Sequence, residues 1–222
     1  MCYQSMFDGC TSLTTAPELP ATTLVNGCYY GMFKNCTSLT QAPELPVTTL
    51  APSCYVDMFS GCTSLTTAPE LPATTLANGC YNAMFYNCTS LVNAPELPAT
   101  TLASWCYASM FAGCASLTQA PALPATTLAT NCYNAMFRGC SSLTTAPELQ
   151  ATTLTTQCYY WMFAGCTKLN YVKAMFTDIL AKNCLENWLI NVSSTGTFVK
   201  NANATWTNED AGIPEGWAVE TA

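Results

Sequence analysis

Residues 28–53 read CYYGMFKNCTSLTQAPELPVTTLAPS, and from Cys54 the chain repeats this stretch with few changes. A Met-Phe pair recurs every 26 residues without an insertion, and its methionines are Met6, Met32, Met58, Met84, Met110, Met136 and Met162. Seven copies in one register predict a solenoid, in which each copy packs only on its neighbours.

The composition limits the classes of partner. Half of the 222 residues are hydrophobic and 9% are charged, so Thr, Ser and Asn must cover most of the surface of a folded protein. The net charge is −7 with six Lys and Arg in total and no basic stripe, which argues against nucleic acid as a partner. No apolar run approaches the roughly 18 to 20 residues of a membrane-spanning helix. The sequence begins inside a repeat, and we expect an export signal and earlier repeats upstream.

The spacing within one copy predicts a short helix. Leu24, Cys28 and Met32 are four residues apart, which places them on one helical face. Thr22 or Thr23, just after a proline, is the expected N-cap. The residue before the second cysteine of each copy is always Gly or Asn, the two types that accept a left-handed backbone at a helix end. These residues are Gly9, Asn35, Gly61, Asn87, Gly113, Gly139 and Gly165.

The proline-rich half of each copy predicts a short extended segment. Two prolines exclude a hydrogen-bonded strand over the whole length, so the extended part is expected around residues 39–42, with Leu39 and Leu45 inward and Glu44 outward. Stacked copies would then form a parallel ladder with about 4.8 Å between strands. A 26-residue unit also falls within the roughly 20 to 29 residues of leucine-rich repeats. We therefore predict an α/β leucine-rich-repeat solenoid with short parallel strands on one face and short helices on the other.

The phrase M-F-x-[GN]-C-x-S-L, followed by a proline-bearing segment, resembles the BspA-like leucine-rich repeats of bacterial surface proteins. The usual motif of that family is A-F-x-x-C-x-x-L-x-x-I-x-I-P, and the resemblance covers residues 2 to 170. The positions that match it in the second copy are Met32, Phe33, Cys36, Leu39, Leu45 and Pro46. The unit here is longer, and Ala-Pro-Glu stands where the family prefers an aliphatic residue. The resemblance implies an exported adhesion or ligand-binding surface and no reaction.

The last part of the chain is predicted to cap the solenoid. We expect seven repeats, the first truncated, over residues 1–183 and a capping segment over 184–222. The segments GTFVK, ATWT and GWAVE have the pattern of short β-strands. The apolar side chains that would cover the last repeat are Trp188, Phe198, Trp206 and Trp217, although these tryptophans could instead stack on sugars. The segment also resembles the ends of such arrays in gut bacteria of the Bacteroides kind and in viruses that infect them.

Fifteen cysteines form two columns, from Cys2 to Cys158 and from Cys10 to Cys166, with Cys184 in addition. The two cysteines of a copy would lie about 10 Å apart on a helix, beyond the roughly 7 Å that a disulfide allows. Buried free thiols are the favoured interpretation. Disulfides between neighbouring copies and a metal site are the alternatives, but the chain has no histidine and no C-x-x-C pair.

No pattern predicts an enzyme or a cofactor. Without histidine there is no Ser-His or Cys-His couple, and neither a nucleophile elbow nor a phosphate-binding glycine loop is present. One glutamate per copy forms a column that Ala122 interrupts. This column is either simply solvated or an acidic stripe for a basic partner or cations. Its members are Glu18, Glu44, Glu70, Glu96 and Glu148.

Comparison of the copies identifies a second set of candidate binding residues. Core positions barely change, whereas the residues after each Cys-Tyr and Met-Phe pair and before each first cysteine vary and are expected to face outward. Variation there is neutral or displays residues that contact a partner. Aromatic side chains are the preferred anchors of interfaces. The candidates are Tyr30, Tyr86, Trp105, Tyr160 and Trp161.

These observations favour a non-enzymatic adhesion or ligand-binding module that is secreted or displayed on the cell surface. Its partner would be a protein or glycan on a host or neighbouring cell. Two other interpretations stay open: a receptor-binding or structural component of a virion that infects gut bacteria, and a structural spacer in a larger envelope protein.

Overall fold

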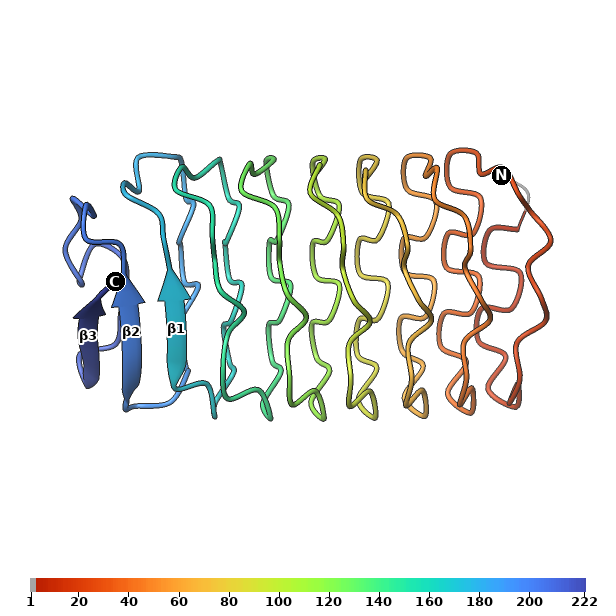
Figure 1. Cartoon of the computed structure of the whole chain (residues 1–222). Helices are drawn as coiled ribbons and strands as arrows, with labels where there is room; N and C mark the ends of the chain where they lie inside the picture. Colours follow the sequence, from red (N-terminus) through yellow and green to blue (C-terminus); the bar gives the residue numbers. More distant parts are fainter. Residues whose placement is uncertain (1–2) are drawn as a thin grey trace.

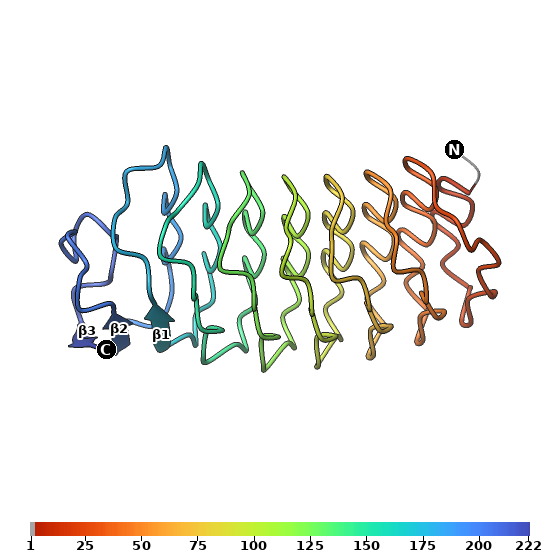
Figure 2. The same cartoon turned by 45° about the horizontal axis from the view of Figure 1, so that its top comes forward.

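The computed structural model describes residues 3–222, which form a solenoid with the two termini at opposite ends (Figures 1 and 2). Each copy of the repeat makes one rung. The regular elements are β1 (Tyr171–Ala174), β2 (Gly196–Lys200) and β3 (Trp217–Thr221), all near the C-terminus. Residues 3–222 contain no helix, and hence no helix that could span a membrane.

The predicted helix face is wrong. In place of each helix the chain makes a series of consecutive tight turns, which we call a turn row and which covers residues 27–35 in the second rung and the equivalent residues of the others. The backbone is left-handed at every fourth residue of the row, with φ of 63° at Gly27, 58° at Gly31 and 58° at Asn35. An α-helix of L-residues is right-handed throughout, so these three positions exclude it.

The hydrogen bonds of a turn row alternate between two directions. The N–H of Tyr29 donates to the carbonyl of Cys54 in the next rung at 2.9 Å, whereas the N–H of Tyr30 donates back to Gly27 at 3.3 Å. The same alternation continues along the row and recurs in the other rungs. The backbone donors of a row are therefore satisfied partly within turns and partly by the neighbouring rung, which ties successive rungs together.

Prolines explain why strands form only at one end. Each early rung has two prolines, such as Pro43 and Pro46, that lack the N–H a ladder requires. These rungs make only isolated parallel bridges, for example Gln41 to Thr67. The sequence YVKA has no proline and forms β1. β1 pairs in parallel with β2, and β2 with β3, in the order β1-β2-β3.

The core consists of columns of identical side chains. One tyrosine and one phenylalanine per rung, such as Tyr55 and Phe59, stack on their equivalents with ring centroids 5.3 to 6.0 Å apart, and from the second to the seventh rung they are buried. Aromatic pairs at this separation contribute about 0.5–1.5 kcal/mol beyond their burial. Leu39 and Leu45 are buried and Glu44 is exposed, which confirms the orientation predicted for the proline-rich segment.

The cysteines are free thiols. All fourteen described cysteines are unpaired, thirteen of them buried and Cys10 exposed; Cys2 lies outside the described residues. The thiol of Cys62 donates to the carbonyl of Phe33 in the preceding rung at 3.1 Å, and the equivalent bond recurs from Cys36 to Cys166. This cysteine column thus provides a side-chain hydrogen bond between neighbouring rungs.

Trp188 ends both aromatic columns. Its ring centroid lies 6.4 Å from those of Tyr159 and Phe163, and its indole N–H donates to the carbonyl of Ala211 at 2.6 Å. Strands occupy GTFVK and most of GWAVE, as expected, whereas ATWT is not a strand. The indole N–H of Trp206 donates to the carbonyl of Phe176 at 3.2 Å. Because this tryptophan is buried, it packs in the core and does not present its ring to a sugar.

Candidate binding surfaces

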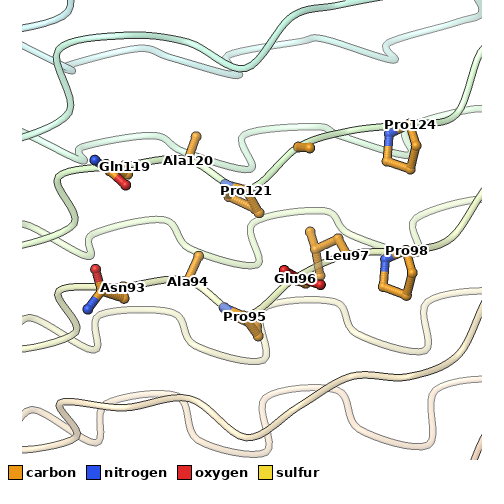
Figure 3. Close-up of a pocket in the computed structure, with 11 residues that line it drawn as sticks. Asn93, Ala94, Pro95, Glu96, Leu97, Pro98, Gln119, Ala120, Pro121 and Pro124 are labelled. Carbon is orange, nitrogen blue, oxygen red and sulfur yellow. The ribbon is translucent and has the colours of Figure 1, made fainter.

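The proline-rich segments form one long side of the solenoid, and the turn rows lie behind them (Figures 1 and 3). We call this side the proline face; it consists of residues 42–46 and their equivalents in the other rungs. Shallow grooves lie between successive segments, with volumes of about 340, 250 and 530 Å³. The three follow one another from the second to the fifth rung, so this face is furrowed along much of its length.

The largest groove lies between the fourth and fifth rungs. Figure 3 shows equivalent residues of the two rungs side by side, with Asn93 next to Gln119 and Pro95 next to Pro121. This groove is also where Ala122 takes the place of the repeated glutamate, so one wall lacks a carboxylate. Proline rings offer apolar contact and the two amides offer hydrogen bonds, a combination suited to a partly polar ligand.

The predicted glutamate column lies on the proline face, and all of its members are exposed. Glu148 pairs with Lys173 of β1 at 3.0 Å. Glu44, Glu70 and Glu96 line the three grooves. The structure therefore places an acidic edge along the furrowed side.

A second hollow, of about 410 Å³, lies on the turn side and extends from the second to the fifth rung. Lys34 donates to Asp57 in the next rung at 3.0 Å, and this hydrogen bond raises the pKa of Lys34. Tyr86, 41% exposed, borders the same hollow. The variable positions of four rungs thus meet in one place, although the hollow is shallow and polar.

The remaining aromatic candidates are distributed over the turn rows. Trp105 is 45% exposed, while Tyr30 is half-buried. Tyr160 and Trp161 are also half-buried and contact each other, with ring centroids 6.2 Å apart. The guanidinium of Arg138 lies 4.8 Å from the centre of the Trp161 ring. Of the five predicted aromatic residues, only Tyr160 and Trp161 come together.

Comparison with known sequences decides the family. The sequence profile of the BspA-type leucine-rich repeat region matches six copies over residues 2–94 and 57–190. The chain belongs to this family. Searches of curated proteins and of solved structures returned no match.

The cysteines and carboxylates of these BspA-type repeats are the side chains that could bind a metal ion or act as nucleophiles. Within residues 3–222, no group of three or more Cys, Asp or Glu side chains is placed to hold a metal ion. Burial raises the pKa of the Cys62 and Cys114 thiols to about 12, so they stay protonated at neutral pH and are poor nucleophiles. The regular cysteines are therefore structural parts of the repeat.

Sequence reasoning missed two features of these surfaces. It treated Ala122 only as a gap in an acidic column, whereas the structure shows a larger groove there. It named Arg138 only as a variable position, because its contact with Trp161 joins residues 23 apart in sequence. The available signals were that Ala122 replaces a glutamate found in five other copies and that Arg138 is the one arginine of the chain.

Proposed function

We propose that this chain is a non-enzymatic binding module of a secreted or surface-displayed protein, and that a protein or glycan partner lies along the proline face. The observation that carries the proposal is the set of three consecutive grooves on one exposed side. Membership in the BspA-type family, a family of repeat proteins often found as surface or binding modules, supports it.

The architecture suits an elongated partner. Repetition places similar grooves one rung apart, so a ligand that spans several rungs makes several similar contacts, each of them weak. The exposed glutamates along the grooves favour a partner with basic or hydroxyl groups over an acidic one. The variation at Ala122 gives one groove a shape different from the others and makes it the preferred anchoring point.

The test is to screen the purified chain on arrays of glycans and extracellular-matrix proteins and then to measure the best hit with Ala122→Glu. This substitution restores the residue that the other copies have, so the fold should be kept. It also narrows the largest groove. We expect at least about tenfold weaker binding, since the added side chain occupies part of the groove that the ligand would fill.

Thr130→Glu is the matched control. It adds the same charge at an exposed position beside a turn row, away from the proline face. Equal loss of binding in both variants would contradict the groove assignment. An absence of any hit on both arrays would contradict the binding function and favour a structural spacer.

A further inference from the structure

Two tryptophans occupy backbone positions that suit them poorly. Trp105 has a φ of 62° and Trp161 a φ of 54°, in the left-handed region that bulky residues rarely enter. At the place of Trp161 the other rungs have smaller residues, which are Ser5, Gly31, Asp57, Ala83, Ser109, Ala135 and Asn187. Neither the turn nor the core requires an indole here, and backbone strain of this kind is typical of functional positions.

The surroundings of Trp161 hold two unused polar groups. Its indole N–H is shielded from solvent and has no hydrogen-bond partner within residues 3–222. Arg138, the one arginine of the chain, is exposed and stacks on the indole. Among the described ion pairs, which join Lys34 to Asp57 and Lys173 to Glu148, none involves Arg138. The guanidinium is thus held by the ring and keeps its donors available.

Tyr160 completes the cluster. Its ring lies 6.2 Å from that of Trp161 at an angle of 39°, so the two rings form a bent apolar platform next to a cation. A platform of this kind suits the C–H face of a sugar ring, and a guanidinium pairs with a carboxylate through two parallel hydrogen bonds.

We propose that Arg138, Tyr160 and Trp161 form a binding site for a carboxylate-bearing sugar, such as a uronic or sialic acid residue. The carboxylate pairs with Arg138, and the sugar ring lies against the two aromatic side chains. Glu186 takes the place of Tyr160 in the next rung, so the acidic group approaches from the Arg138 side.

An acidic peptide is a poorer fit to this surface. A bound peptide needs free backbone groups to form a strand or turn, and the N–H groups of the turn rows already donate within the row or to the next rung. The site lies on the turn side and does not depend on the assignment of the proline face.

The experiment is calorimetric titration of the whole chain with two acidic probes and their neutral counterparts. Tetragalacturonate is paired with its methyl ester, and sialyllactose with lactose, so that the two sources of the carboxylate are distinguished. We expect binding of at least one acidic probe and at least about tenfold weaker binding of its neutral counterpart. Equal binding of an acidic probe and its counterpart, or no binding of either acidic probe, would overturn the proposal, and the groove experiment above would still stand.

Three variants test the residues. Arg138→Gln should weaken binding of the acidic probe at least about tenfold. Trp161→Asn should abolish this binding and leave the melting temperature unchanged or higher, since Asn accepts the left-handed backbone. Lys168→Gln removes the same charge at an exposed position outside the cluster and should change the affinity less than about twofold. Unchanged binding by Trp161→Asn, or an equal loss by Lys168→Gln, would refute the assignment.

Discussion

At the scale of single residues, the fold depends on one backbone requirement repeated three times per rung. The third left-handed position of each turn row is always Gly or Asn, whereas the first two also admit Ser, Ala, Asp, Gln and Trp. A left-handed backbone costs about 1–2 kcal/mol for an ordinary L-residue and little for Gly. The third position, which admits only Gly and Asn, is therefore the one where a left-handed backbone limits the residue type most.

The glycines of the third position provide a matched pair. Gly61 and Gly139 have φ of 76° and 75°, but a Cβ at residue 61 would lie 2.5 Å from the side-chain oxygen of Asn35, while at residue 139 the nearest atom is 3.7 Å away. We expect Gly139→Ala to lower the free energy of unfolding by about 1 kcal/mol and Gly61→Ala by more. Urea denaturation measures both. A loss for Gly61→Ala no greater than that for Gly139→Ala would contradict a steric cost from Asn35.

At the scale of elements, the sequence predicts the period and the core but not the element type. The buried positions Cys28, Met32 and Cys36 and the left-handed Asn35 follow from the repeat alone. A spacing of four residues fits both an i, i+4 helical face and a row of four-residue turns. The helix is wrong because the backbone is left-handed at every fourth residue, as at Gly27, Gly31 and Asn35, and the spacing alone does not reveal this.

The binding surfaces were less predictable for a related reason. The outward direction of Glu44 follows from its place between buried residues, but the size of a groove depends on how two rungs pack. The first two left-handed columns were hidden because Trp105, Trp161 and Ala83 occupy positions where Gly would have revealed them. Residue types that rarely enter the left-handed region at these positions conceal the turn from sequence reasoning.

The stability of the C-terminal end of the solenoid is predicted to depend on Trp188. This side chain is 1% exposed and contacts aromatic rings of the last rungs and of β2. Trp188→Ala should lower the free energy of unfolding by about 3–5 kcal/mol, since it opens a cavity and leaves the carbonyl of Ala211 unpaired. Trp105→Ala, at the exposed tryptophan, is the control and should change it by less than about 1 kcal/mol. Similar losses in both would argue that Trp188 does not cap the stack.

At the scale of the whole molecule, packing of the solenoid shields the buried thiols from reagents in solution. Without reductant, denatured protein should give all fifteen thiols of the chain in a titration. In the folded protein the thirteen buried cysteines should react slowly, and Cys10 should react fast. Fewer than about ten reactive thiols after denaturation would indicate disulfides between rungs.

The same thiols predict loss of stability at alkaline pH. Burial raises the pKa of Cys54, Cys62 and Cys114 to about 12, whereas an unfolded thiol ionises near about 8.5. Between these values the unfolded chain has released protons that the folded chain keeps, so stability falls as pH rises, by about 1.4 kcal/mol per pH unit for each such thiol. Urea denaturation at a series of pH values measures the slope. Constant stability up to about pH 10.5 would contradict burial of the thiols.

One side of each rung is a turn row with a left-handed residue at every fourth position, and this backbone decides which side chains face outward and where the binding surfaces lie. Ala83 tests it, since its φ is 52° and it lies in the middle of the segment that the helical interpretation assigned to a helix. The measurement is the change in the free energy of unfolding for Ala83→Gly. The turn row predicts a rise of about 1 kcal/mol, because Gly accepts the left-handed backbone; a fall of about 1 kcal/mol, the effect of Gly inside a helix, would contradict it.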